Sequence, residues 1–308
     1  MVLGSSIDLS SMGKREPEPL TNAGNAGEQI GMASQEQVDQ YHDQGYFIAD
    51  DAVSPDMLEQ LSAAAHRAVA KVRAGEVIDD GEGIRTGGGG TEPEFVSGLI
   101  APEFGEPVFA AYLGSEPIAD HLRPFLGDEL RMGWVHLACM RGEYLCGWHR
   151  DTAGKERDGG YELEMEVLGR HRSHFVKWHL ALDDDPCLWI VPGSQRRYRT
   201  ELEHECLIND TQGDIPGAVQ IDLRRGQTIF WNSNTIHRGR KPDGMGDRAT
   251  LMGALIDHRA AYDDAGEKGD HRWMLAGNVR DSVQGRTRRY YHNWLALAER
   301  RMAVVNGG

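Results

Sequence analysis

The chain has 308 residues, of which 40% are hydrophobic and 26% are charged, so it can bury a substantial core. This composition excludes a wholly disordered protein. Asp and Glu number 48 against 33 Lys and Arg, which gives a formal net charge of -15. Such a balance argues against a protein that tracks nucleic-acid phosphates and against one that binds an anionic membrane surface.

Targeting and cysteine content point to a cytoplasmic protein. No apolar run approaches the roughly 20 residues that a membrane span requires, and neither a secretory nor a peroxisomal signal is present. The four cysteines are too scattered for a disulfide scaffold or a cysteine zinc site. We expect all of them to be buried or half-buried thiols: Cys139, Cys146, Cys187 and Cys206.

The chain begins with a segment that has no helical or strand pattern. Residues 1–33 are rich in Gly, Ser, Glu and Pro, which is typical of a flexible tail. Ser34 then begins a capping-box sequence, and Gly45 ends the short helix that follows. Residues 46–49 favour a strand.

The strongest helical pattern of the chain follows. Ser54 and Pro55 predict its start, with apolar residues at helical spacing up to Gly75. The segment 81–104 contains four consecutive glycines but no Gly-Lys-Ser/Thr, so we expect a mobile loop and no phosphate-binding loop. Residues 116–126 predict another helix.

From about residue 129 the pattern changes to short apolar or alternating runs separated by turn residues. The candidate strands are Leu130–Met140, Ser173–Asp183, Leu188–Val191, Val219–Leu223, Gln227–Asn232 and Ala249–Asp257. Many short strands favour an antiparallel sandwich or barrel. The polar stretch 152–172 is expected to be an insertion, and residues 290–302 a closing helix.

These elements predict a single domain over residues 34–308, after the tail 1–33. We expect a helical part over 34–128, a β core over 129–260 and a C-terminal helical extension over 261–308. The fold class is therefore mainly β with flanking helices.

Two histidines and one aspartate have the pattern of a metal site. His149 and Asp151 are two residues apart, so on a strand both side chains would point to the same side and grip one ion. His237, at the end of an apolar run that we expect to be a strand, could complete the set. Two histidines and one carboxylate leave three positions open on a six-coordinate ion, which suits Fe(II) that must hold a cosubstrate and O2.

An arginine after His237 suits an anionic cosubstrate. The segment 238–247 is rich in turn residues, so we expect a hairpin loop that makes Arg248 the start of the strand next to His237. A guanidinium there could hold a dicarboxylate by a bidentate ion pair while the other end of the molecule chelates iron. Thr250 follows two residues later.

Several segments in this order resemble a known family. They are Gly45-Tyr46-Phe47-Ile48 with Val53-Ser54-Pro55, Trp148-His149-Arg150-Asp151, Ala181-Leu182-Asp183-Asp184, Val191-Pro192-Gly193-Ser194, and His237 with Arg248. From about Tyr46 to Asp257 the chain resembles the phytanoyl-CoA dioxygenase-like branch of the Fe(II)/2-oxoglutarate-dependent oxygenases.

The resemblance implies a double-stranded β-helix and a set of site residues. Iron would be held by His149, Asp151 and His237, and 2-oxoglutarate would be anchored by Arg248. Thr250 matches the small hydroxyl residue that accompanies this arginine in relatives.

The resemblance also implies a cosubstrate contact on the strand that ends at Ala181. In relatives a side chain two residues before this alanine contacts the cosubstrate, and that position is His179 here. Lys177 lies on the same face by alternation and is a weaker candidate. Two positions depart from the family pattern, Gln195 and Gln227, and neither is a ligand position.

The expected chemistry is hydroxylation, desaturation or ring formation on a small molecule, with O2 consumed and 2-oxoglutarate converted to succinate and CO2. Halogenating members of the family replace the metal-binding carboxylate with a small residue, and Asp151 is intact. The sequence specifies neither the substrate nor the oligomeric state.

Two other classes of function stay open from the sequence. A metal-dependent jelly-roll enzyme without oxygen chemistry, such as an isomerase, would use similar ligands but would not require Arg248. A catalytically silent binding protein would require neither the ligands nor the arginine.

Overall fold

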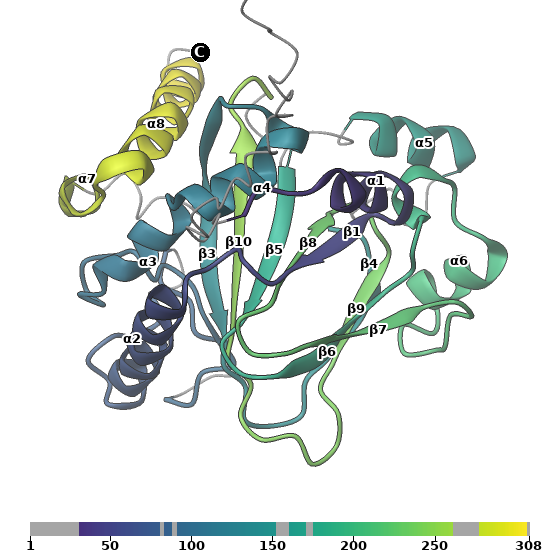
Figure 1. Cartoon of the computed structure of the whole chain (residues 1–308), viewed down its shortest axis with the longest axis horizontal. Coiled ribbons are helices and arrows are strands. Elements are labelled where there is room, and N and C mark those ends of the chain that lie inside the picture. The colour runs from purple at the N-terminus through teal and green to yellow at the C-terminus, as the bar shows by residue number, and fades with distance from the viewer. Residues whose placement is uncertain are drawn as a thin grey trace, which may run out of the picture.

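The computed structural model describes residues 31–80, 83–87, 91–151, 160–170, 175–260 and 277–306. Of the tail expected over residues 1–33, only the last three lie within the described residues. Two antiparallel sheets face each other, and helices α2, α3 and α8 cover the far side of the larger sheet (Figure 1). This is the architecture of a double-stranded β-helix with flanking helices, as the sequence predicts.

The first elements form where their local signals place them. Helix α1 (Gln35–Gln44) has the predicted capping box at Ser34, and strand β1 (Tyr46–Ala49) follows it. Helix α2 (Pro55–Arg73) has Ser54 as its N-cap, and the Ser54 hydroxyl accepts a hydrogen bond from the Met57 N–H at 3.3 Å. These three predictions are confirmed.

The next segment contains more structure than the sequence predicts. Within the expected loop lies a two-residue strand, β2 (Phe95–Val96), and helix α3 (Pro107–Leu113) precedes the predicted helix α4 (Glu116–Leu126). Helix α3 has seven residues, which is too short for a helical period to be visible in the sequence.

The strands form one sheet of six and one sheet of four. The larger sheet has the order β1-β8-β5-β10-β3-β2. Its further members are β3 (Leu130–Ala138), β5 (Phe175–Ala181), β8 (Thr228–Asn232) and β10 (Thr250–Asp257). The smaller sheet has the order β4-β9-β6-β7. Its members are β4 (Leu145–His149), β6 (Asp185–Ile190), β7 (Val219–Leu223) and β9 (His237–Arg240).

The strand arrangement around His237 differs from the prediction. Strand β8 ends at Asn232 and His237 begins the separate strand β9, so this histidine does not end an apolar strand. Strand β9 pairs with β4 and β6, whereas β10 belongs to the other sheet. Arg248 therefore does not start a neighbour of the His237 strand, because the intervening loop crosses between the two sheets.

Further helices lie in the polar insertion, after β6 and at the C-terminal end. Part of the polar insertion forms helix α5 (Tyr161–Arg170), which the sequence did not predict, and a 3-10 turn, η2 (Ser194–Arg196), precedes α6 (Glu201–Ile208). At the C-terminal end, α7 (Gly277–Ser282) is followed by α8 (Gly285–Asn306), which is longer than the predicted helix over residues 290–302.

The larger sheet separates two apolar layers by simple alternation of side chains. Trp178, Phe230 and Leu251 lie on the outer face and pack with the helices in the main core. Gly253 is required there, because a Cβ at this position would lie 2.3 Å from the Trp178 ring. Ala181 and Trp231 lie on the inner face, in a second cluster with side chains of β6 and β7. The inner face is where polar side chains also gather.

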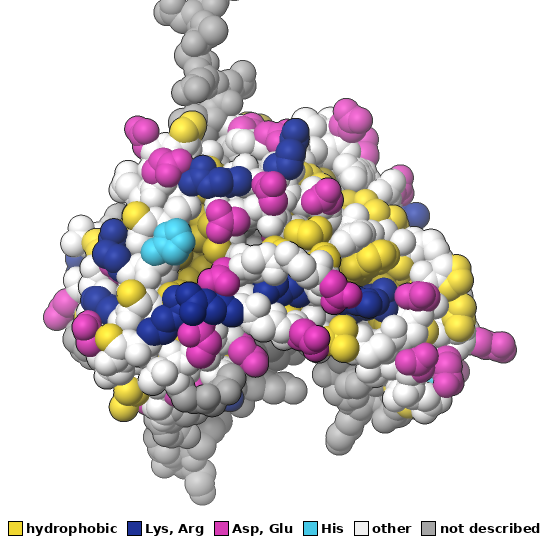
Figure 2. Space-filling model, turned by 90° about the horizontal axis from the view of Figure 1, so that it is seen from below, with side chains coloured by type: hydrophobic (Ala, Val, Ile, Leu, Met, Phe, Trp, Pro, Cys, Tyr) yellow, Lys and Arg dark blue, Asp and Glu magenta, His cyan; other side chains and the backbone are white. Residues whose placement is uncertain are grey.

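The surface carries charges of both signs. Figure 2 shows acidic and basic side chains interspersed over one face, with no large patch of a single sign. Among the described residues no helix combines the length and apolar character needed to cross a membrane. All four cysteines are free thiols, with Cys139, Cys187 and Cys206 buried and Cys146 half-buried, as predicted.

The outer apolar layer predicts a clear difference between two leucines. Leu255 is fully buried, whereas Leu202 is 46% exposed. Leu255→Ala should lower the free energy of unfolding by about 2–5 kcal/mol, because a cavity forms against the helices. Leu202→Ala should cost less than about 1 kcal/mol. Urea unfolding measures both values, and equal losses would contradict the packing described here.

Candidate metal centre

Strand pairing brings the two predicted histidines together. His149, the last residue of β4, lies directly opposite His237, the first residue of β9, and their ring centroids are 4.2 Å apart. Each Nδ1 is within hydrogen-bond distance of a backbone carbonyl: Gly147 O at 2.7 Å for His149 and Thr235 O at 2.8 Å for His237. When Nδ1 carries the proton and donates it to the carbonyl, Nε2 keeps its lone pair, as in metal-binding histidines.

Asp151 completes the cluster from a turn. The strand ends at His149, so Asp151 does not share a strand with it as expected, and its N–H donates to Ser233 O at 3.0 Å. Its Oδ1 lies 3.9 Å from His149 Nε2 and 3.7 Å from His237 Nε2. One ligand atom from each of the three residues lies within 4.8 Å of the other two. The predicted convergence is confirmed, by a different local geometry.

The cluster is poised to bind a cation. Burial and the neighbouring His149 lower the pKa of His237 to about 3, so its imidazole is neutral at physiological pH. Burial alone would raise the pKa of Asp151, but the charges of Lys177 and the two histidines outweigh it and lower this pKa to about 2. His237 and Asp151 therefore already have the protonation states that metal binding needs. Burial lowers the pKa of His149, but Cys146 and Asp151 outweigh burial and raise this pKa, so a metal competes with a proton at His149.

Lys177 lies directly against this carboxylate. Its Nζ is 2.9 Å from both oxygens of Asp151, and its side chain is 12% exposed. The ammonium also lies 5.1 Å from the Trp231 ring centroid and 5.7 Å from that of Trp134. The structure therefore places Lys177 at the metal ligands rather than at Arg248.

The turn after β6 holds the segment before His237. Ser194 Oγ accepts a hydrogen bond from the Ile236 N–H at 2.8 Å and lies 2.7 Å from Val191 O, to which it donates. The Val191 N–H donates to Ile236 O at 2.9 Å. Gly193 has a φ of 77°, a left-handed conformation that favours glycine. The Val-Pro-Gly-Ser segment thus fixes where β9 begins.

Arg150, between the two ligands of the His-Arg-Asp segment, connects the site to helix α5. It forms a buried ion pair with Glu164, and its Nη2 donates to Ser194 O at 2.9 Å. Glu164 also pairs with Arg199 at 3.1 Å. The helix inside the polar insertion is therefore anchored beside the metal ligands by buried charges, a long-range contact that the sequence pattern did not reveal.

His179 lies deeper on the same inner face. Its ring contacts that of Trp231 edge-on at 4.4 Å between centroids, and Trp231 also lies 6.0 Å from the His237 ring. Burial lowers the pKa of His179 well below its usual value, with the nearby Arg248 and Lys177 acting in the same direction. His179 Nδ1 and Trp231 Nε1 are both buried, and neither has a hydrogen-bond partner among the described residues. Two unpaired polar atoms thus lie beside the metal ligands.

Arg248 and Thr250 do come together, around a carboxylate of the chain. Asp185, at the start of β6, accepts hydrogen bonds at Oδ2 from Arg248 Nε at 3.1 Å, Arg248 Nη2 at 2.9 Å and the Thr250 hydroxyl at 2.6 Å. The sequence analysis did not single out Asp185. In the sequence Asp185 is only an acidic residue at the start of an apolar run. Its contact with Arg248 becomes visible only when the two sheets are placed against each other.

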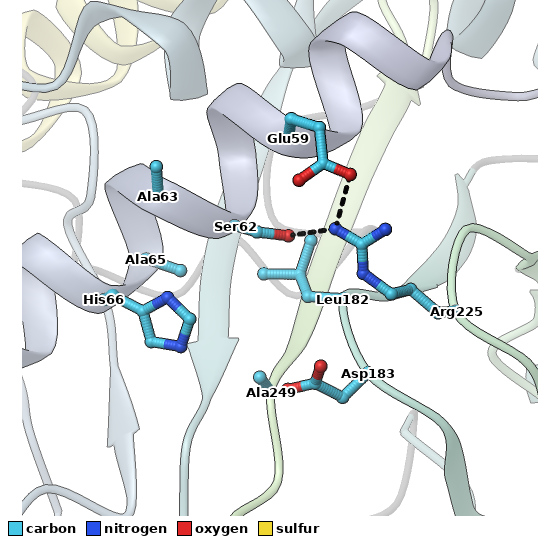
Figure 3. Close-up of a pocket in the computed structure, with 9 residues that line it drawn as sticks. All are labelled: Glu59, Ser62, Ala63, Ala65, His66, Leu182, Asp183, Arg225 and Ala249. Carbon is cyan, nitrogen blue, oxygen red and sulfur yellow. Dashed lines mark hydrogen bonds and ion pairs between the residues drawn. The ribbon is translucent and has the colours of Figure 1, made fainter.

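A separate pocket lies on the outer side, between helix α2 and two loops. It has a volume of about 280 Å³ and is lined by Glu59, Ser62, Ala63, Ala65, His66, Leu182, Asp183, Arg225 and Ala249. Figure 3 shows Arg225 reaching toward α2, where it lies 3.0 Å from Glu59 and 3.3 Å from Ser62. No metal ligand lines this pocket, so it is distinct from the candidate site.

A His-Asp-His cluster on the inside of a double-stranded β-helix defines a class: the non-haem iron oxygenases that use 2-oxoglutarate. The profile of the phytanoyl-CoA dioxygenase (PhyH) family matches residues 41–249. This is more than half of the chain, so the chain belongs to that family and is an Fe(II)- and 2-oxoglutarate-dependent oxygenase.

Solved structures share the fold at low sequence identity. EctD from S. alaskensis, solved with 2-oxoglutarate and 5-hydroxyectoine, is 21% identical with a TM-score of 0.57, over 74% of this chain and 78% of EctD. AviO1 from Streptomyces viridochromogenes Tue57 is 18% identical with a TM-score of 0.53, over 75% of this chain and 97% of AviO1. SnoN, an α-ketoglutarate-dependent epimerase from nogalamycin biosynthesis, is 17% identical with a TM-score of 0.52, over 74% of this chain and 82% of SnoN. No curated protein sequence matches the chain significantly.

The contact between Lys177 and Asp151 predicts a stability difference that depends on pH and metal. Lys177→Met leaves Asp151 without its main counter-charge, which should cost about 1–3 kcal/mol at pH 7 without metal. Because the Asp151 pKa is lowered to about 2 in the folded chain, the loss should be full above about pH 4, the unfolded value. It should shrink as the pH falls toward 2.

Urea unfolding of both metal-free proteins at pH 7, at pH 4 and at about pH 2.5 measures the pH dependence, and Mn(II) is added at pH 7. A divalent cation replaces the missing ammonium, so Mn(II) should stabilise the variant more than the unchanged protein. Equal stabilisation of both by Mn(II) would argue against contact between Lys177 and the metal ligands.

Proposed function

We propose that the chain is a hydroxylase of a small-molecule metabolite, in which His149, Asp151 and His237 hold Fe(II). One observation carries the proposal: three ligand atoms of the required chemistry lie within 4.8 Å of one another on the inner side of the barrel. Both histidines have Nδ1 at a carbonyl, so Nε2 is the nitrogen left for a metal. Two imidazoles and one carboxylate suit iron better than magnesium, and the cluster found among the described residues includes no cysteine, which would favour structural zinc.

The residues deeper in the barrel fit a dicarboxylate cosubstrate. Between the three ligands and Arg248 lie Trp231 and His179, each with a buried polar atom that has no partner among the described residues. A buried polar group without a partner is costly, so a bound molecule with oxygen acceptors would satisfy the Trp231 N–H and, when Nδ1 carries the proton, His179 as well. We propose that 2-oxoglutarate lies along this row, with its distal carboxylate at Arg248 and Thr250.

Fe(II) and 2-oxoglutarate, when bound, supply the oxidising chemistry, which turns 2-oxoglutarate into succinate and CO2 with consumption of O2. The chain positions and shields the reactants. Lys177 keeps Asp151 ionised and fixes its orientation through two contacts of 2.9 Å. His179 stays neutral because of its burial and the nearby cations, so it adds no positive charge beside Arg248. Trp231 closes the wall between His179 and His237 against water.

The substrate would occupy the remaining space between the sheets. Trp134, His136 and Met252 point to the inner face of central strands, yet all three are only half-buried. Inward side chains of a central strand are normally covered, so their exposure indicates open space next to Lys177 and the metal ligands. We propose that this space takes a small polar molecule. Asp151, present as a metal ligand, leaves no position for the halide of a halogenating enzyme.

Removal of one ligand should separate metal binding from folding. His237→Ala should lower affinity for Fe(II) or Mn(II) at least about 100-fold and abolish succinate release, while circular dichroism shows an intact fold. The exposed His204 offers a matched control, and His204→Ala should change neither property. Isothermal titration under anaerobic conditions gives the metal affinity. A His237→Ala protein that binds iron normally would contradict the ligand assignment.

A metabolite library tests the reaction itself. Purified protein with Fe(II), 2-oxoglutarate and O2 should release succinate slowly alone and faster with its substrate, whose product should be one oxygen atom heavier. A product lighter by two hydrogens would replace hydroxylation with desaturation or ring formation. Metal binding without succinate release under any condition would favour a non-oxidative enzyme of isomerase type, and absence of metal binding would favour a binding protein.

A further inference from the structure

The anion site formed by Arg248 and Thr250 already holds a carboxylate, that of Asp185. Besides the three hydrogen bonds to Oδ2, Asp185 Oδ1 accepts one from the backbone N–H of Cys187 at 3.0 Å. Asp185 is 2% exposed and Arg248 is 4% exposed. Both predicted anchor groups for the cosubstrate therefore bind a residue of the chain.

Asp185 accepts hydrogen bonds from only one edge of the Arg248 guanidinium, and the Nη1 side has no oxygen acceptor among the described residues. Nε and Nη2 of Arg248 donate to Asp185, whereas Nη1 lies 4.0 Å from the sulfur of Met140, a weak acceptor. The Tyr144 ring lies 5.4 Å from the guanidinium carbon. A carboxylate that approaches Arg248 must take the Nη1 side next to Asp185 or displace Asp185 from the Nε side.

Either route places two carboxylates beside one buried guanidinium. The charges of Arg248 and Asp185 cancel, so a further carboxylate adds an uncompensated negative charge to a site with little solvent. Asp185 stays ionised at neutral pH: burial would raise its pKa, but Arg248 and the hydrogen bonds from its donors lower it below the usual range. The repulsion is therefore present under physiological conditions.

We propose that Asp185 is a specificity-determining residue that weakens the binding of 2-oxoglutarate, through its ion pair with the cosubstrate anchor Arg248. This inference rests on the proposed function, in which Arg248 receives the distal carboxylate. Asp185 sets the affinity for a dicarboxylic 2-oxo acid. With Asp185 present, the enzyme is half-saturated at a higher cosubstrate concentration than it would be if Arg248 had no carboxylate partner.

Asp185→Asn tests the proposal, since it removes the charge and keeps the shape and an oxygen acceptor. Anaerobic titration of 2-oxoglutarate into the Mn(II)-loaded protein should give a Kd about tenfold lower in the variant, as expected for removal of one neighbouring like charge. The Kd for Mn(II) should not change. Asp183→Asn is the matched control, because Asp183 is exposed and lines the outer pocket. The Kd of this variant for 2-oxoglutarate should equal that of the unchanged protein. An unchanged or higher Kd in Asp185→Asn would overturn the proposal and make Asp185 a residue that merely holds Arg248 in place.

A second measurement covers the case in which Arg248, left without its counter-charge, destabilises the variant. Thermal unfolding of the metal-free proteins in sodium formate is compared with sodium chloride of equal ionic strength. Formate should stabilise Asp185→Asn by several degrees more than the unchanged protein, because it can occupy the vacated charge position. Equal effects on both would overturn the proposal. If Mn(II)-loaded unchanged protein, Asp183→Asn and Asp185→Asn all fail to bind 2-oxoglutarate, the proposed function fails, whereas equal binding by all three contradicts only the role of Asp185.

Discussion

The antiparallel pairing of β4 with β9 is the interaction on which the site depends. It sets His149 opposite His237 and, through the hydrogen bond from the Asp151 N–H to Ser233 O, fixes the turn that carries the third ligand. The histidines need no further side chains to orient them, because in each case the backbone carbonyl two residues earlier in the chain lies at Nδ1. A shift of this register by one residue would turn one imidazole to the outer face and disperse the cluster.

Two ion pairs, one half-buried and one buried, lie on the inner face of the barrel. Lys177 with Asp151 lies at the proposed metal ligands and next to Trp231, and Arg248 with Asp185 lies where we propose that the cosubstrate binds. Each pair is neutral in the cosubstrate-free chain, and the attraction within each pair offsets part of the cost of removing its two charges from water. A divalent cation at Asp151 and a dicarboxylate at Arg248, as proposed, would each add charge beside one of these pairs.

The parts of this structure that the sequence predicts are those governed by local rules. Capping residues such as Ser34 and Ser54 mark the first helices, and alternation marks the long strands, because these signals lie within a few residues. The three ligands were predictable from residue type together with family resemblance. The four-residue strand at His237 was not predictable, because it is too short to show an alternating pattern and because the strands that it pairs with are distant in the sequence. Asp185 was missed for the same reason: its function arises from a contact between two sheets.

The central claim is that two imidazoles and one aspartate bind a single ferrous ion on the inside of the barrel. An anaerobic crystal structure of the protein with Fe(II) and 2-oxoglutarate tests it most directly. We expect one iron bound by Nε2 of His149, an oxygen of Asp151 and Nε2 of His237, with the cosubstrate bound on the side of His179. Iron bound elsewhere, or bound through only one of these side chains, would contradict it.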